Sequence, residues 1–475
     1  MRRRTTPTLT SSHLTRRGFL QIGAAGLSLP ALLSLQQTAV GHEAAKTGHG
    51  KAKSVIVLFA WGGMSHLDTW DMKPDADTST RSAFKPIKTS TPGVHLCEHM
   101  PGIAKHTHRM TIVRSAHHEA PSHRSAAYWN LTGHPPPNLS GNWPRSRQDW
   151  PCIGSMVDAA LRDNGAPRDK TLPGAVCLPY TMYDGGDANG QDGGFLGVGY
   201  DPVIFKPPTG RPYDGVSPNS ASLNLKPVDG VDGQRMADRR ALLSRINASA
   251  NQVPGQAPTP DFTGPTNRFQ EQALDLLLTP KARDAFDLDK EPAERRQAYG
   301  DHICGQSVLA ARRLAEAGVP IVTVYCAAGD LNGSAGAHWD THGNGFNRIK
   351  DQMLPPLDQA SDALLTDLAA SGRLDDTLVV WLTECGRTPK VNGSGGRDHY
   401  PNGYSVAFAG AGIAGGQVYG RSDKTGSEPA DKPCRPEDLH ATIFHAMGID
   451  LDHKIHDLQQ RPVAICDGTP LPIFA

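Results

Sequence analysis

Six short stretches of the chain consist almost entirely of apolar residues, many of them β-branched, and each predicts a strand. They are residues 54–60, 110–114, 175–178, 320–325, 377–383 and 405–409. A continuous apolar run, in place of alternation with polar residues, is typical of a strand whose two faces are both buried. The chain therefore contains the strands of a large sheet that is covered on both sides.

Amphipathic segments lie between and beyond these strands and predict helices. They are residues 233–250, 267–297, 307–317, 354–371 and 436–447. In the segment 354–371, for example, Leu357, Ala360, Leu364 and Leu368 form one apolar stripe. Buried strands that alternate with amphipathic helices predict an α/β three-layer sandwich with a mostly parallel central sheet and helices on both faces.

Residues 1–41 differ from the rest and predict an export signal. Arg16 and Arg17 precede Gly-Phe-Leu and a short apolar run at residues 22–35. This pattern resembles a twin-arginine signal, and the run is short for a membrane span. We expect export by that route to the periplasm or beyond, with residues 42–475 as a single mature domain that has no transmembrane span. An uncleaved membrane anchor is the alternative.

Composition changes this picture in three respects. Lys plus Arg and Asp plus Glu are 48 each, so no net charge favours nucleic acid as a partner. The 50 glycines and 38 prolines indicate long loops, and a loop-rich and helical excursion is expected at about residues 180–300. None of the 8 cysteines forms a CxxC pair, which argues against a structural zinc knuckle and specifies no disulfide pattern. The oligomeric state is likewise not specified.

Polar clusters follow several of the predicted strands, where the ligands of a doubly wound sheet collect. Asp68 follows the first strand and is either a metal ligand or the cap of a turn. Ser122 and Ser125 open a helix. A hydroxyl at a helix N-terminus is favoured as a nucleophile, although serine is also one of the commonest helix caps.

The strongest local indication of a metal is the run His338-Trp339-Asp340-Thr341-His342. Imidazole nitrogens and a carboxylate at alternate positions can converge on one ion, as they do in zinc sites. The alternative is a polar loop whose histidines face water. We expect a divalent metal cofactor, with zinc as the first expectation and manganese or calcium as alternatives.

A last cluster follows the strand at 377–383. Glu384 would enter the ligand crevice, and Arg387 is suited to bind a phosphate-like or sulfate-like group in a bidentate manner. The alternative is an Arg387–Glu384 ion pair. Asp398 and His399 follow on a glycine-flanked loop and add two further candidate ligands.

With these residues in view, the chain resembles the bacterial family called domain of unknown function 1501. The resemblance rests on "GGMSHLDTWDMKP", "LTGH", "WDTH", "ECGRTPKVNGSGGRDHYP", "GAGIAGGQVYGRSD" and "DLHATIFHAMGID". That family is similar in turn to the alkaline-phosphatase and sulfatase superfamily. The resemblance implies an alkaline-phosphatase-like sandwich, one or two divalent metals, and a nucleophile that opens a helix.

Mapped onto this chain, the resemblance assigns roles to single positions. Asp68, Asp340, His342 and His399 resemble metal ligands, and Ser122 lies close to the nucleophile position, with Ser125 as the alternative. Two features depart from the superfamily pattern: Cys-x-Pro-Ser-Arg is absent, which argues against a formylglycine sulfatase, and Glu384-Cys385 replaces an Asp-His pair, which puts a second metal in doubt.

Two functions follow as hypotheses. The first is an exported metal-dependent hydrolase of phosphate or sulfate esters, acting on a small-molecule or glycan ester. The second is a catalytically degenerate binding or scaffold protein of the cell envelope with the same fold. Metal content and the hydrolysis of an activated ester discriminate between them.

Overall fold

The computed structural model describes residues 48–141, 143–165, 169, 171–207, 233–250, 270, 273–276, 279–327, 331 and 337–475. The predicted export signal at residues 1–41 lies outside these residues. Residues Gly48–Ala475 form one compact unit by their internal contacts. Among the described residues, no helix has both the length and the apolar character that crossing a bilayer requires.

The described residues build a central sheet of 8 strands in the order β12-β4-β11-β8-β1-β7-β5-β6. Their bounds are β1 Ser54–Phe59, β4 Met110–Ala116, β5 Ala175–Leu178, β6 Val203–Ile204, β7 Ile321–Tyr325, β8 Thr377–Leu382, β11 Tyr404–Ala409 and β12 Gln417–Tyr419. All neighbours pair in parallel except β11, which is antiparallel to both β4 and β8. The predicted α/β fold with a mostly parallel sheet is confirmed.

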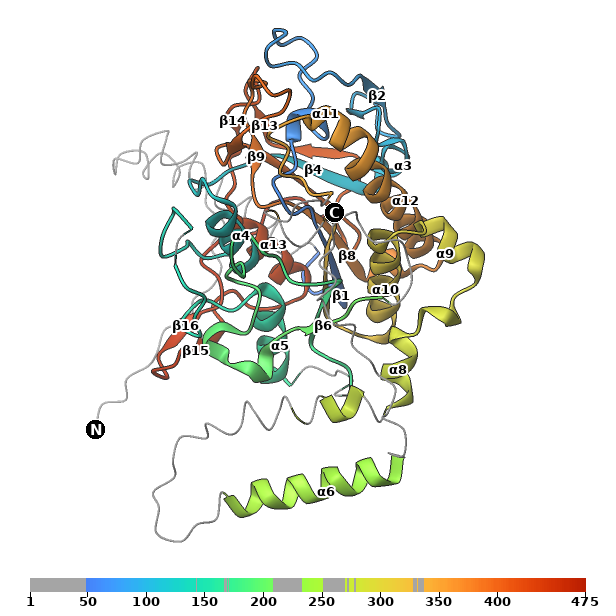
Figure 1. The fold of residues 1–475 in the computed structure, drawn as a ribbon, viewed down its shortest axis with the longest axis vertical. Coiled ribbons are helices and arrows are strands. Elements are labelled where there is room, and N and C mark those ends of the chain that lie inside the picture. The colour runs from blue at the N-terminus through green and yellow to red at the C-terminus, as the bar shows by residue number, and fades with distance from the viewer. Residues whose placement is uncertain are drawn as a thin grey trace, which may run out of the picture. The chain divides into compact units, whose positions relative to one another are not determined.

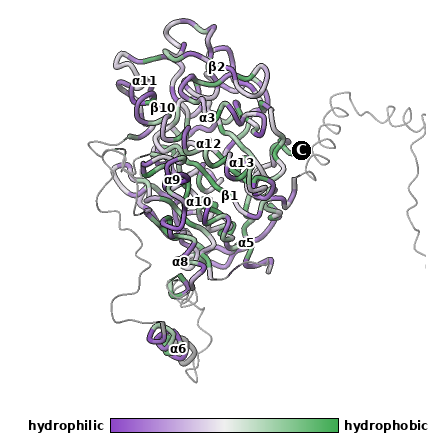
Figure 2. Tube along the Cα trace, turned by 90° about the vertical axis from the view of Figure 1, so that its right-hand side faces the viewer, coloured by the Kyte–Doolittle hydropathy of each residue, from purple (hydrophilic) through white to green (hydrophobic). Residues whose placement is uncertain are grey.

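Helices cover both faces of this sheet (Figure 1). On one side lie α10 (Ile303–Ala317) and α12 (Leu354–Ala370), and α10 contacts both β1 and β7. On the other side lie α4 (His123–Thr132), α5 (Ile153–Asp163) and α13 (Pro436–Ala446). Every residue of β1, β7 and β8 is buried between these layers, which explains their continuous apolar sequences. Figure 2 shows hydrophobic stretches of the chain in the interior around β1.

Smaller elements surround the sandwich. The helices are α3 Pro101–Ala104, α6 Gly233–Ala250, α8 Pro280–Phe286, α9 Ala293–Tyr299 and α11 Gly345–Arg348. The two-stranded ladders are β2 (Pro86–Lys88) with β3 (His95–Cys97), β9 (Gly386–Arg387) with β10 (His399–Tyr400), β13 (Arg421–Ser422) with β14 (Pro429–Asp431), and β15 (Lys454–His456) with β16 (Pro462–Ala464).

One predicted helix is wrong. Within residues 267–297 the helix is interrupted: residues 270 and 273–276 are helical, and the helices α8 and α9 that follow are separated by a 3₁₀ turn at Leu288–Lys290. Pro292 has no N–H to donate and limits the conformation of Glu291 before it, so it starts a new helix and does not continue the old one. The other predicted strands and helices are found within a few residues of their expected ends.

The topology brings five loops to one edge of the sheet. Strands β1, β7 and β8 run in parallel, and β4 shares their direction because both β4 and β8 are antiparallel to β11. The segments after these four strands, and the segment before β11, therefore meet at one edge. They include nearly all the polar clusters that the sequence singled out.

Three buried histidines brace α4, the helix that opens at this edge. His118 donates from Nε2 to the carbonyl of Glu384 (2.6 Å), and its Nδ1 accepts from the Ala120 N–H (3.1 Å). His440 donates from Nε2 to the Asn130 carbonyl, 2.9 Å away, and His134 packs nearby. Burial lowers the pKa of each of these three histidines to about 4.

We therefore expect acid to destabilise the fold. Each imidazole is neutral when folded, so its stabilisation is present above the ordinary pKa of 6.5 and is lost as the pH falls through about 4. Between pH 7 and pH 5 this amounts to roughly 2 kcal/mol of unfolding free energy per histidine. Urea unfolding at both values measures it. His440→Gln, which keeps a donor for Asn130, should flatten the profile, whereas exposed His95→Gln should not. Identical profiles for His440→Gln and wild type would contradict the assignment.

Candidate metal centre

Asp340 is the centre of a polar cluster at this edge of the sheet. Its Oδ1 faces three imidazole Nε2 atoms and one guanidinium nitrogen. The distances are 3.2 Å to His123, 3.0 Å to His342, 3.3 Å to His399 and 2.6 Å to Nη2 of Arg387. Three imidazole nitrogens thus face one carboxylate oxygen, and nitrogen and oxygen donors of these kinds are the ones that zinc sites use.

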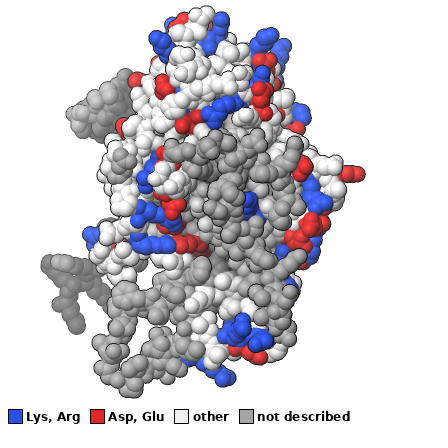
Figure 3. Space-filling model, in the orientation of Figure 1, with Lys and Arg blue, Asp and Glu red and all other residues white. Residues whose placement is uncertain are grey.

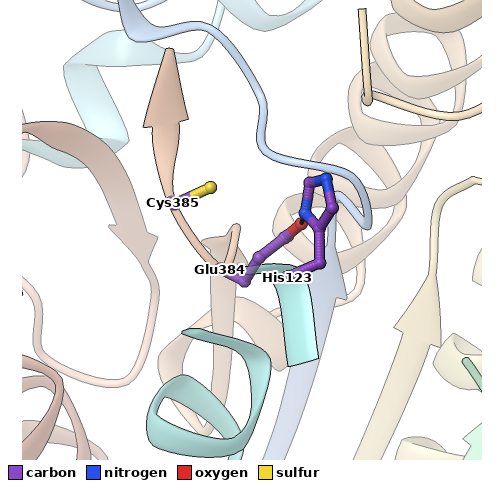
Figure 4. Close-up of side chains that lie close together, drawn as sticks. All are labelled: His123, Glu384 and Cys385. Atoms are coloured by element: carbon purple, nitrogen blue, oxygen red, sulfur yellow. Dashed lines mark hydrogen bonds and ion pairs between the residues drawn. The ribbon is translucent and has the colours of Figure 1, made fainter. Parts of the chain in front are cut away.

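The other nitrogen of each imidazole is held by an oxygen. Nδ1 contacts Glu384 Oε1 in His123 (2.7 Å), Asp398 Oδ1 in His342 (2.7 Å) and the Pro121 carbonyl in His399 (3.2 Å). Figure 4 shows the Glu384 side chain reaching from the end of β8 to the ring of His123. An oxygen acceptor at Nδ1 holds a proton there, so that Nε2 can exchange its own proton for a cation, as in histidines that bind metals. All three rings are therefore oriented with Nε2 toward Asp340.

Local structure explains why these side chains converge. His123 is the first residue of α4, and Glu384 follows β8 directly. The β9–β10 ladder pairs His399 with Arg387, which sets both beside Asp340. Gly62 completes the frame: its N–H donates to Glu384 Oε1 (2.8 Å), and at its φ of +111° a Cβ would lie 2.4 Å from the backbone nitrogen of Asp340. Only glycine allows this close approach.

Arg387 balances the charge of Asp340 from inside the protein. Its side chain is 0% exposed and also donates to the carbonyls of Gly62 and Gly63. Burial raises the pKa of Asp340, but the neighbouring imidazoles of His123 and His399 and the charge of Arg387 outweigh this effect and hold that pKa well below its ordinary value. Asp340 is therefore a carboxylate at any physiological pH. Arg387 pairs with Asp340, so the expected alternative of a pair with Glu384 is not the contact found.

The cluster fits a bound cation on an observation of its own. His123 Nε2 is buried and makes no hydrogen bond of acceptable geometry, although Asp340 Oδ1 is close. An unpartnered buried nitrogen is costly, and a metal ion would use its lone pair. The ligand atoms of His123, Asp340 and His399 all lie within 4.8 Å of one another, as do those of His123, Glu384 and Cys385.

The predicted serine nucleophiles lie at the same helix terminus but have other contacts. Ser122 is the N-cap of α4, and its Oγ accepts from the Ser125 N–H. The Ser125 hydroxyl donates to the Leu139 carbonyl (2.7 Å), and Gly141 packs against Ser122 Oγ. Both hydroxyls thus face the loop at 138–141. Their catalytic role stays a prediction.

Two predicted metal ligands also have other partners. Both Asp68 oxygens accept from Arg397, with Nε to Oδ2 at 2.8 Å and Nη2 to Oδ1 at 3.1 Å, and Ser65 adds a third hydrogen bond. His338 is buried beside Arg348, and burial lowers its pKa to about 4. The structure gathers the other predicted ligands, Asp340, His342, Glu384, Asp398 and His399, in and around the cluster.

Sequence reasoning missed His123. It is 3% exposed and lies between Glu384 and Asp340, the two carboxylates of the cluster. Burial lowers its pKa, but the neighbouring side chains of Asp340, Cys385 and Glu384 raise that pKa well above the ordinary value. The available indication was its position immediately after a serine cap at a strand-to-helix turn.

Comparisons with known proteins give the family and a distant likeness of arrangement. No curated protein matches the sequence. Similar solved structures include a sulfatase from Pseudoalteromonas sp. (TM-score 0.36, 12% identity, 87% of this chain and 72% of that chain), a phosphonate monoester hydrolase from Silicibacter pomeroyi (0.33, 12%, 88% and 76%) and the lipoteichoic acid synthase of Listeria monocytogenes (0.34, 9%, 87% and 78%). Nothing about activity follows from likenesses this remote.

The family model described as "Protein of unknown function (DUF1501)" matches residues 52–472, which is almost the whole of the described unit and includes every residue of the metal centre. The chain therefore belongs to the DUF1501 family.

Proposed function

We propose that this protein is a divalent-metal-dependent hydrolase of phosphate or sulfate esters that acts outside the cytoplasm. The observation that supports the proposal is the convergence of three Nε2 atoms on Asp340 Oδ1, with an oxygen at Nδ1 of each ring. Imidazole nitrogens and a carboxylate oxygen that meet in this way are the ligands that zinc-like ions take, with the ion in place of the protons at Nε2.

The chain's own residues would divide the work. His123, Asp340, His342 and His399 would hold the metal, and when bound it would supply positive charge for an ester's non-bridging oxygens. Glu384 and Asp398 would fix the tautomers of His123 and His342. Arg387 is fully buried, so it would neutralise and position Asp340 and would not bind substrate directly.

The open side of the site suits an ester from solution. His342 is 45% exposed and Asp398 is 53% exposed, whereas His123 and Glu384 are buried beneath them. A substrate would therefore approach over His342 and Asp398. Phosphate and sulfate esters both present anionic oxygens to the positive charge of the metal, so both are substrates to be tested.

Elemental analysis combined with an ester assay tests the function. We expect the purified mature chain to hold stoichiometric zinc, manganese or calcium and to hydrolyse 4-nitrophenyl phosphate or 4-nitrophenyl sulfate, with the activity lost in a chelator and restored by the metal. His342→Ala should lose metal and activity together, because it removes one imidazole ligand from the exposed side, where folding is least affected.

His95→Ala is the matched control, since His95 is an exposed histidine on β3 and has no place in the cluster. A metal-free, folded and inactive wild type would contradict the proposal. A chain that binds the metal but hydrolyses neither ester would favour the envelope binding protein, which retains the fold and a structural ion.

A further inference from the structure

A groove with an excess of positive charge adjoins residues 79–80, which are hydrogen-bonded to the loop that precedes Asp398 and His399. It consists of two adjoining cavities of about 770 and 440 Å³ that share the wall formed by residues 72–74. The first cavity is completed by residues 75–76, 421–425 and 430, and the second by residues 81–86. We call it the cationic groove. Figure 3 shows Lys and Arg side chains at the top of the view, over the region of β2, β13 and β14 in Figure 1.

Five cations line the groove, and four of them carry uncompensated charge. Lys73 is paired with Asp71. Arg81, Lys85, Arg421 and Lys424 are exposed and have no ion-pair partner in the part of the chain that the structure describes. On a chain with no net charge, this grouping is a local excess that would attract anions.

The two lining carboxylates do not cancel this excess. Asp423 accepts from the N–H groups of Thr425 (3.0 Å) and Ser427 (2.8 Å) and from the Thr425 hydroxyl. The Asp423 carboxylate is therefore occupied by hydrogen bonds within the turn between β13 and β14. Only Asp75 adds an exposed negative charge to the lining. Each of the two cavities thus has two exposed cations in its lining, Arg421 and Lys424 in the first and Arg81 and Lys85 in the second.

The groove wall is tied to the loop that carries two residues of the metal centre. Arg397 donates from Nη2 to the Thr80 carbonyl (2.9 Å), and the Val391 N–H donates to the Ser79 carbonyl (2.8 Å). Asp398 and His399 follow Arg397 directly. A long ligand held in the groove would therefore lie next to a segment that is hydrogen-bonded to the loop of Asp398 and His399.

From this arrangement we infer that the cationic groove binds an anionic polysaccharide, whose esters would be presented to the metal centre. The inference rests on the proposed function for the last step only. A polysaccharide fits better than a single-stranded nucleic acid, because nucleic-acid grooves add exposed aromatic rings for base stacking. The only aromatic residue in the lining is Phe84, which is 8% exposed and packs against His99 and Phe346.

Binding of dextran sulfate to the full mature chain tests the inference, with neutral dextran as the reference. Arg81→Gln with Lys85→Gln removes two positive charges from the second cavity. Arg421→Gln with Lys424→Gln removes two positive charges from the first cavity. We expect each pair to weaken binding about threefold, and the four together at least about tenfold, with a shallower dependence on salt because fewer counterions are released.

The matched control is Lys51→Gln with Lys454→Gln, two exposed lysines outside both cavities, which should bind as wild type does. Unchanged binding of dextran sulfate by the variant with all four substitutions would overturn the inference. So would tighter binding of a single-stranded oligonucleotide than of dextran sulfate with the same number of charges. The measurement needs no turnover. A chain that binds dextran sulfate through these residues but hydrolyses no ester would refute the proposed hydrolase and leave the groove standing.

Discussion

Replacing Asp340 by asparagine should lower the affinity for the metal by more than a hundredfold and abolish ester hydrolysis. Asp340 supplies the carboxylate oxygen that three histidines face, at 3.0–3.3 Å. The amide has nearly the same shape but no negative charge, so an ion at this point would lose its main charge compensation. Competition with a chromophoric chelator measures the affinity of each variant.

Glu384→Gln should lower the metal affinity less than Asp340→Asn does. Glu384 touches His123 through Nδ1 and not through Nε2, so it would orient a ligand without being one. Loss of such support costs about 10- to 100-fold in metal affinity, less than the loss of a ligand. Asparagine at 340 also leaves Arg387 buried without its counter-charge, so unfolding in a chelator must be measured alongside. Wild-type metal affinity in folded Asp340→Asn would remove Asp340 from the site.

The second large effect is expected at the buried pair of Asp68 and Arg397. Both side chains are 2% exposed and joined by two hydrogen bonds, and Arg397 also donates to the carbonyls of Thr80 and Thr388. Arg397→Met should lower the unfolding free energy by about 3–5 kcal/mol, because it leaves a buried carboxylate without its partner. Urea unfolding measures this cost.

A double-mutant cycle separates the pair from its surroundings. Asp68→Leu combined with Arg397→Met should recover part of the loss, since no isolated charge then remains. The cycle would fail if the two changes simply added. Asp68→Asn also tests the metal role that the sequence resemblance assigns to Asp68: we expect full metal content in this variant. Loss of metal from a folded Asp68→Asn protein would instead make Asp68 a ligand.

The two predictions concern separate groups of side chains at one edge of the sheet. Arg387 and Asp340 belong to the metal centre, whereas Arg397 and Asp68 lock the first-strand loop onto the 388–398 loop. Arg397 lies next to Asp398, and its carbonyl accepts from Arg387 Nη1 (3.3 Å). The structural pair therefore also fixes the backbone on which Asp398 and His399 are placed.

The sequence alone determined the sheet and the edge at which polar residues collect. Runs such as 54–60 and 377–383 are buried on both faces in any arrangement that hides them, so their strand character did not depend on their partners. Once the strands were parallel, the residues after them had to meet. The alternate donors of His338-Trp339-Asp340-Thr341-His342 already indicated a candidate metal-binding loop, because these residue types occur there at high density.

Only the tertiary structure decided which side chains meet. Asp68 is separated from Arg397 by 329 positions, so the competition between a metal and an arginine for its carboxylate is not visible locally. The helix end shows the same limit. Ser122 turns its oxygen back to the N–H of Ser125 as a cap, while His123, one position later, extends between Glu384 and Asp340. The direction of each side chain follows from how α4 is held against the segment after β8, where Asn130 donates to the Glu384 carbonyl, and that arrangement is a property of the whole fold.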